Sequence, residues 1–200
     1  AIAMGTQMVH QHFMLVPTLR VADNVVLGRE PRRRGFYDRK EAAETVRRLS
    51  QEYGLEVPPE KLVGDLSVGE QQRVEIIKAL YQGAQLLILD EPTAVLTPQE
   101  VDDLFKVVSR LRESGKSIII ITHKLKETMA ISDRVYVLRQ GKMIGERNTA
   151  DTSIEELSEL MVGHKVATVI RESMEPGETV LVIDHVSVES ANAVQELKDN

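Results

Sequence analysis

The chain has 200 residues, of which 42% are hydrophobic and 28% charged, a composition typical of a globular protein and not of a disordered or fibrous one. Its net charge of −6 gives nucleic-acid binding no bulk electrostatic support. The absence of cysteine excludes a disulfide framework and a thiolate metal site, and fits a reducing cytoplasm. The longest apolar runs, Leu86–Leu89 and Ile118–Ile121, are too short to span a bilayer.

The first predicted elements are short. Apolar patterning predicts a strand at Met8–Val9 and a helix over Val21–Leu27, and the Pro-, Gly- and Arg-rich segment Glu30–Tyr37 favours a loop. Asp38, with an acid three residues later, predicts the start of a helix that stops by Pro58-Pro59. The predicted apolar face of this helix consists of Ala42, Val46, Leu49 and Tyr53.

The middle of the chain alternates helix and strand. Ser67 with Glu70 has the spacing of a capping box and predicts a second helix. The continuous apolar run Leu86–Leu89 predicts a strand covered on both faces. Thr97–Glu100 combines a cap, a first-turn proline and a reciprocal acid, and so predicts another helix start. Ser117–Thr122 predicts a second buried strand.

Farther along, Gln140-Gly141 predicts a hairpin turn between two short strands, and Ser153 with Glu156 predicts a last capped helix. Strands that alternate with helices predict an α/β fold with a mostly parallel sheet. Between Asp38 and Leu80 helices dominate, which indicates a helical subdomain inserted into that core. A new strand is predicted at Val180–Val188.

Asp90 and Glu91 follow the strand Leu86–Leu89 directly. Ligands of open parallel sheets bind outside the carboxyl ends of the strands. In phosphate-loop ATPases an aspartate at this place holds Mg²⁺, and a second acid beside it can polarise or deprotonate the attacking water. Alone, the pair could equally cap the turn before Pro92.

The segment LSVGEQQR, Leu66–Arg73, places Ser67 and the Gly69 backbone at a helix amino terminus. Unpaired N–H groups and the positive end of the helix dipole favour an anionic phosphate there. An acid beside a phosphate is unfavourable, so we expect Glu70 to turn back and cap Ser67. The capping box on its own would support only an ordinary capped helix.

The run from Leu66 to Glu100 resembles, in its order, the signature and Walker B segments of ABC-type ATPases. The LSVGE form and the segment Met14–Gly28 resemble the ATP-binding subunits of simple-sugar and nucleoside importers. The segment around Gln11 resembles the Q-loop of this family, and the one around His123 its switch histidine. His10 and His12 could also indicate a zinc site, for which a third ligand is lacking.

The resemblance implies a P-loop-NTPase-like α/β core with an inserted helical subdomain, incomplete at its amino terminus because no Walker A loop precedes Gln11. Gly115-Lys116-Ser117 is the only Gly-Lys-Ser, and it runs from helix to strand, the reverse of a phosphate loop. Residues 1–163 would form a first ABC domain with its helical subdomain at about 20–82. Residues 164–178 would form a linker, and 179–200 the opening strands of a second ABC domain.

The resemblance also implies ATP and Mg²⁺ as cofactors. Glu91 would act on water and His123 on the γ-phosphate, while Gln11 and Asp90 would serve the metal. The nucleotide-binding residues would be Gln11, Ser67, Val68, Gly69, Glu70 and Asp90. One departure is Thr97, which stands where the family's D-loop usually ends in an acid.

The implied partners are transmembrane permease subunits, a second ABC ATPase domain and, indirectly, a solute-binding protein, at the cytoplasmic face of the cell membrane and without nucleic acid. We expect the chain by itself to bind Mg-ATP weakly and not to hydrolyse it, because the phosphate-loop lysine and most phosphate-binding N–H groups are absent. Ala1 in place of Met suggests that the chain is part of something longer. We also expect an open sheet edge that invites self-association or is filled by Val180–Val188. The alternatives are a regulatory or docking module and a nucleic-acid repair ATPase, although the latter class carries insertions that this chain lacks.

Overall fold

The computed structural model of the protein describes residues 4–164 and the short segments 188–190 and 193–195. The chain divides into two compact units, Ala1–Val166 and Ala167–Asn200. In the second unit the described residues form one antiparallel pair, β8 (Val188–Ser190) with β9 (Ala193–Gln195). The strand predicted at Val180–Val188 falls, up to residue 187, outside the described residues.

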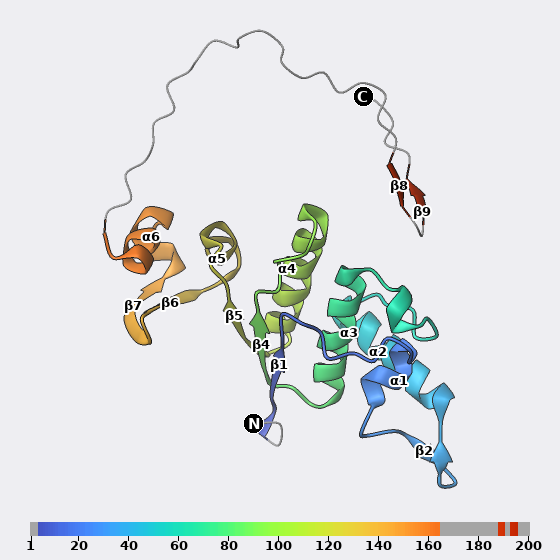
Figure 1. The fold of residues 1–200 in the computed structure, drawn as a ribbon. Helices are drawn as coiled ribbons and strands as arrows, with labels where there is room; N and C mark the ends of the chain where they lie inside the picture. The colour runs from blue at the N-terminus through green and yellow to red at the C-terminus, as the bar shows by residue number, and fades with distance from the viewer. Residues whose placement is uncertain (1–3, 165–187, 191–192, 196–200) are drawn as a thin grey trace. The chain divides into compact units, whose positions relative to one another are not determined.

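Three parallel strands form the sheet of the first unit, in the order β1-β4-β5 (Figure 1). These are β1 (Thr6–Val9), β4 (Leu86–Asp90) and β5 (Ser117–Ile121). Val9 lies opposite Leu89 in the first pair, and Asp90 lies opposite Ile121 in the second. The segments that follow the three strands therefore leave the sheet at the same edge, and the predicted α/β fold with a parallel sheet is confirmed.

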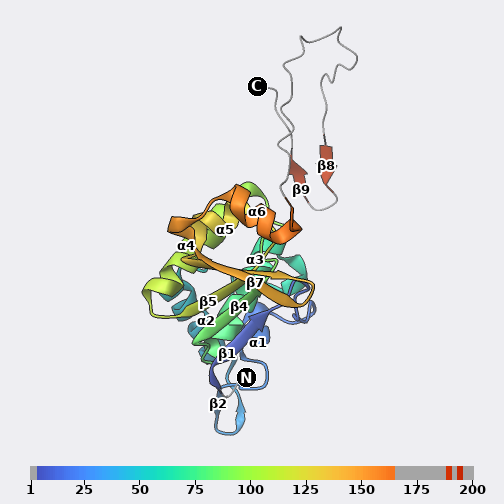
Figure 2. The ribbon, with the colours of Figure 1, turned by 90° about the vertical axis from the view of Figure 1, so that its left-hand side faces the viewer.

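Helices pack beside β1 and contribute much of the core (Figures 1 and 2). These helices are α1 (Val21–Val26), α2 (Arg39–Tyr53) and α3 (Val68–Tyr81), with the 3-10 turn η2 (Val63–Asp65) before α3. The apolar side chains that they and their connections bury to 1% exposure or less are Val21, Val25, Val26, Ala42, Val46, Leu55, Val63, Val74, Ile76 and Ile77. Hydrophobic burial of this extent is the main source of stability in a domain of this size.

The start of α2 agrees with the sequence, and its last residue, Tyr53, lies before the predicted stop at Pro58-Pro59. The Asp38 carboxylate accepts a hydrogen bond from the Glu41 N–H at 3.1 Å, as a cap does. The helix ends at Gly54, before Pro58-Pro59. Gly54 takes the left-handed conformation with φ 67° and donates its N–H to the Ser50 carbonyl, which closes the last turn.

The remaining described elements come from the carboxyl-terminal part of the first unit. They are α4 (Pro98–Glu113), α5 (Leu125–Ile131), β6 (Arg134–Arg139), β7 (Lys142–Asn148), η3 (Thr149–Asp151) and α6 (Ile154–Val162). β6 and β7 form a separate antiparallel hairpin around the predicted Gln140-Gly141 turn. Gly115-Lys116-Ser117 joins α4 to β5, the helix-to-strand direction that the sequence predicts. Within residues 4–164 no helix is long and apolar enough to cross a membrane.

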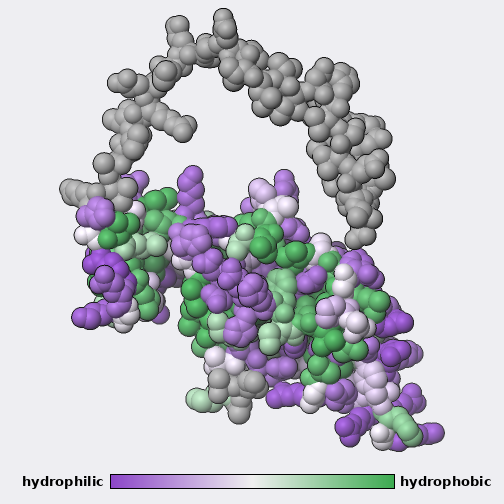
Figure 3. Space-filling model, viewed as in Figure 1, coloured by the Kyte–Doolittle hydropathy of each residue, from purple (hydrophilic) through white to green (hydrophobic). Residues whose placement is uncertain are grey.

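The prediction that both strands of the core are covered on two faces is wrong. Along β4 the buried positions alternate with half-buried ones, and on β5 Ile119 and Ile121 are 48% and 47% exposed. One face of the sheet packs against the core through Leu87, Leu89, Ile118 and Ile120, and the alternate positions on β4 and β5 are more exposed. Figure 3 shows further hydrophobic residues at the surface near β6, β7 and α6.

The predicted loop over Glu30–Tyr37 contains a small hairpin, β2 (Arg32–Arg33) with β3 (Phe36–Tyr37). Its two turn residues, Arg34 and Gly35, both have positive φ angles, 53° and 87°. Two left-handed residues in succession are the geometry of the tight turn that suits strand twist. An arginine at the first turn position gives little sequence signal for it.

Candidate functional site

The predicted site residues Gln11, Asp90 and His123 follow three neighbouring strands. Asp90 is the last residue of β4, while Gln11 and His123 each come two residues after the end of β1 and β5. The parallel register brings these three chain segments to one edge of the sheet. The segments that follow β4 and β5 are joined by hydrogen bonds from Glu91 to Ile121 and to His123.

Glu91 and His123 lie in direct contact. The Glu91 carboxylate is 3.0 Å from the His123 Nδ1 atom, and the imidazole is 66% exposed whereas the carboxylate is 32% exposed. The Glu91 backbone has φ 45°, and its N–H donates to the Ile121 carbonyl at 2.9 Å. A carboxylate that contacts one imidazole nitrogen fixes the ring, so that the other nitrogen faces solvent and is available for a ligand.

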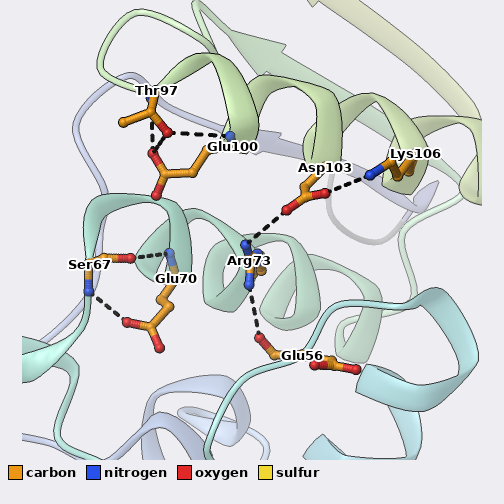
Figure 4. A network of polar contacts seen from close by, with 8 residues as sticks. All are labelled: Glu56, Ser67, Glu70, Arg73, Thr97, Glu100, Asp103 and Lys106. Atoms are coloured by element: carbon orange, nitrogen blue, oxygen red, sulfur yellow. Dashed lines mark hydrogen bonds and ion pairs between the residues drawn. The ribbon is translucent and has the colours of Figure 1, made fainter. Parts of the chain in front are cut away.

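The LSVGE segment begins α3 with a complete capping box (Figure 4). Ser67 Oγ accepts from the Glu70 N–H at 3.2 Å, and the Glu70 carboxylate accepts from the Ser67 N–H at 2.7 Å. Glu70 therefore turns back onto Ser67, as the sequence analysis expects. The N–H groups of Val68 and Gly69 belong to the first turn, which has no intrahelical acceptors, and they lie at the positive end of the helix.

Gly69 lies where a side chain of α4 approaches α3 closely. The carboxylate of Glu100, which caps α4 together with Thr97, lies against the first turn of α3 (Figure 4). A Cβ atom at Gly69 would come within 2.4 Å of the Glu100 carboxylate. One turn along, Asp103 lies between Lys106 at 2.9 Å and Arg73 at 4.0 Å, and its pKa is lowered chiefly by the hydrogen bond from Lys106.

A set of polar contacts that is not evident from the sequence lies behind Glu91. The buried Gln72 side chain on α3 donates to the Pro92 carbonyl at 2.8 Å. Thr93, 2% exposed, donates its hydroxyl to Glu127 at 2.6 Å, and Lys124 donates to the Thr93 carbonyl at 2.9 Å. These residues hold the turn that follows Asp90-Glu91. The available signal was a glutamine on the buried side of an amphipathic helix.

The side chains at this edge of the sheet carry oxygen atoms of the kind that bind Mg²⁺, one of the two predicted cofactors. Asp90 and Gln11 present carboxylate and amide oxygens, the ligand type that Mg²⁺ prefers, and Mg²⁺ commonly uses one or two carboxylates with phosphate oxygens and water. Among the described residues no group of three or more His, Cys, Asp or Glu side chains could hold a metal by itself. A Mg²⁺ ion held by Asp90 and Gln11 would need phosphate oxygens and water to complete its coordination.

The carboxyl-edge carboxylates, the histidine and the capped signature-type helix define a nucleotide-dependent class of protein. Residues 2–94 match the ABC transporter family. The fold agrees, because 83% of the chain superimposes on 70% of MJ1267, an ATP-binding cassette of an ABC transporter, with TM-score 0.68 and 22% identity. The chain therefore carries an ABC transporter ATP-binding domain, and its core is a P-loop NTPase fold.

Relatives with higher identity are import proteins by name. The chain is 49% identical to the guanosine import ATP-binding protein NupO of Bacillus subtilis strain 168, over 98% of the chain and 39% of the relative. It is 42% identical to the ribose import ATP-binding protein RbsA 3 of Rubrobacter xylanophilus, over 92% of the chain and 37% of the relative. The chain thus spans less than half the length of the curated relatives it matches.

Proposed function

We propose that this chain is part of an ATPase subunit that powers import of a nucleoside or a simple sugar through an ABC-type transporter. The observation that carries the proposal is the Glu91–His123 contact beside Asp90, at the carboxyl edge of a parallel sheet in a chain of the ABC transporter family. The names of the relatives, which include guanosine, ribose and glucose import proteins, support a nucleoside or a simple sugar as the imported solute.

The chemistry assigned to the site divides between the two acids and the histidine. Glu91 accepts a proton from the attacking water or polarises it, and His123, oriented by Glu91, contacts the γ-phosphate. Asp90 and Gln11 would hold Mg²⁺, which would supply neutralisation of the phosphate charge. The first turn of α3, with Ser67 and Gly69, receives a phosphate from a nucleotide bound on a second ABC domain.

The assembly that follows from this function is peripheral to a membrane. Transmembrane permease subunits would be contacted by the helical region, about residues 20–82, and a solute-binding protein would act indirectly. Residues 1–163 would form one ABC domain, 164–178 a linker, and 179–200 the start of the second domain. The cytoplasmic face of the membrane is where ATP is available. A regulatory or docking module has no use for the Glu91–His123 contact, which is why the ATPase is preferred.

The test is phosphate release by two purified proteins, this chain alone and the complete gene product that carries it. We expect the complete product to hydrolyse Mg-ATP and its Glu91→Gln variant to lose on the order of 100-fold or more, the usual contribution of a general base. We expect the chain alone to release no more phosphate than its own Glu91→Gln variant. Equal rates for the complete product and its variant would contradict the role of Glu91.

A further inference from the structure

On helix α3 a carboxylate and an ammonium group bind the backbone N–H and C=O of one residue, Met14, in the segment that follows β1. The Glu75 carboxylate accepts a hydrogen bond from the Met14 N–H at 2.8 Å, and the Lys78 ammonium donates to the Met14 carbonyl at 2.9 Å. Glu75 and Lys78 also lie 3.8 Å apart and are mostly withdrawn from solvent, with side chains 9% and 18% exposed. The backbone N–H and C=O of Met14 are thereby both hydrogen-bonded by one pair of charged side chains.

This pair shares a helix face with the residue that holds the segment after Glu91. Gln72, Glu75 and Lys78 are spaced by three residues, which places their side chains along one side of α3. Gln72 donates to the Pro92 carbonyl at 2.8 Å. The segments that leave β1 and β4, neighbouring parallel strands, are therefore both fixed to the same side of the helix that begins at Ser67.

The segment after Met14 is held as firmly as Met14 itself. Asn24, 1% exposed, accepts from the Val16 N–H at 2.8 Å and donates to the Val16 carbonyl at 3.0 Å. Gln11 lies only three residues before Met14, a reach of about 10 Å at full extension. The exposed Gln11 side chain is therefore placed by an anchored peptide on one side and by β1 on the other.

Stability alone does not explain a buried ion pair at Glu75 and Lys78. Two charges removed from water contribute little net stability, and an apolar pair of similar size commonly packs as well. What an apolar pair cannot supply is an acceptor for the Met14 N–H together with a donor for its carbonyl. The two charges at Glu75 and Lys78 are therefore explained by the backbone N–H and C=O of Met14, which they bind and orient.

We propose that Glu75 and Lys78 are positioning residues for ATP hydrolysis: they hold the backbone N–H and C=O of Met14, and so keep Gln11, three residues earlier, near Asp90. The inference rests on the proposed function. Helix α3 then supports three parts of the site: its own first turn at Ser67, the segment with Gln11 and the segment that follows Asp90.

The test uses four variants of the complete gene product. Glu75→Leu removes the acceptor and the charge, and Glu75→Gln keeps an acceptor. The double variant Glu75→Leu with Lys78→Met replaces the whole pair by apolar side chains that can pack without leaving a charge unpaired. Glu113→Leu, at an exposed position on α4, is the matched control for loss of a glutamate. Amide hydrogen exchange of the segment 11–16, urea unfolding and Mg-ATP turnover are measured on each.

We expect exchange at Met14 to rise roughly tenfold in the Glu75→Leu and double variants, as one lost hydrogen bond allows. Their kcat falls on the order of 10- to 100-fold, the effect of a small misplacement at a catalytic site. The double variant keeps near wild-type stability, while Glu75→Gln and Glu113→Leu keep both wild-type exchange and turnover. A stable double variant with wild-type exchange or wild-type kcat overturns the proposal, whereas a wild-type product without turnover contradicts only the proposed ATPase function.

Discussion

The helical region α1–α3 and the carboxyl-terminal part of the described chain, residues 117–164, bury their apolar side chains to very different degrees. In the helical region Val25, Val46 and Ile77 are fully buried. In residues 117–164 the buried hydrophobic side chains are Val137 and Leu157, whereas Ile119, Leu138 and Met143 are 48% to 70% exposed. The helical region α1–α3 buries its apolar side chains within itself. Residues 117–164 leave apolar side chains at the surface, as proteins do at sites that bind another protein surface.

The largest expected difference between the regions is in core truncation. Ile77→Ala should lower the free energy of unfolding by about 2–5 kcal/mol, since it removes a fully buried side chain from a packed core. Ile119→Ala removes the same atoms from a half-exposed position and should cost below about 1 kcal/mol. Urea unfolding measures both. Equal costs would mean that β5 is covered in solution.

The second prediction concerns the exposed face of β5. We expect the chain to self-associate through this apolar surface, because free strand edges and exposed isoleucines favour pairing with another chain. Replacing both Ile119 and Ile121 by Lys should weaken association about tenfold or more, which corresponds to about 1.4 kcal/mol. Sedimentation at several concentrations is the measurement, and Arg48→Glu together with Lys126→Glu serves as a charge-altering control at exposed sites elsewhere. Unchanged association in the Ile119 and Ile121 variant would place the contact on another surface.

A third prediction compares a glycine in each region. Alanine is usually more favourable than glycine inside a helix by about 1 kcal/mol, but a Cβ at Gly69 meets the Glu100 carboxylate. Gly69→Ala should gain nothing alone and gain stability when Glu100 is also Ala, with a coupling of roughly 0.5–1 kcal/mol in the double-mutant cycle. A Cβ at Gly145 on β7 meets its nearest atom at 3.6 Å, so Gly145→Ala should show no coupling to Glu100.

The smallest expected effect is a pH dependence in the carboxyl-terminal part. The pKa of Glu156 is lowered, first by the hydrogen bond from Arg147 and then by that from Thr152. A lowered folded-state pKa stabilises the protein at pH values above the ordinary glutamate pKa, and the contribution is lost as pH falls through the lowered value. Glu156→Gln should therefore flatten the loss of stability on acidification slightly, whereas Glu155→Gln, its exposed neighbour, should leave it as in wild type. Urea midpoints between pH 6 and pH 3 decide this.

The sequence predicted local structure well because local signals are strong. Caps at Ser67 and Thr97 have a spacing that specifies a helix start, and the apolar run before Asp90 specifies a strand. The same patterns overestimated the burial of β5. An apolar sequence shows that a strand can be buried, but it does not show which element, if any, packs on each of its faces. The hairpin at Arg34-Gly35 was missed because arginine is an uncommon turn residue.

Long-range contacts were the part of the site that the sequence could not show. It placed Glu91 and His123 after two strands, but only the parallel register of β4 and β5 brings them to 3.0 Å. Glu75 and Gln72 are read from the sequence as ordinary polar residues of an amphipathic helix. Their partners are backbone groups of Met14 and Pro92, which carry no side-chain signature at all.

The backbone at Glu91 has a consequence for protein engineering. A left-handed conformation costs a residue with a side chain on the order of 1 kcal/mol, and glycine adopts it without that cost. A Glu91→Gly variant would therefore give up the contact with His123 and yet relax the chain at the end of β4. Selection for thermal tolerance alone would favour such a change, whereas selection for turnover would remove it if Glu91 acts on water as proposed. At residue 91, stability favours glycine whereas the proposed activity requires glutamate.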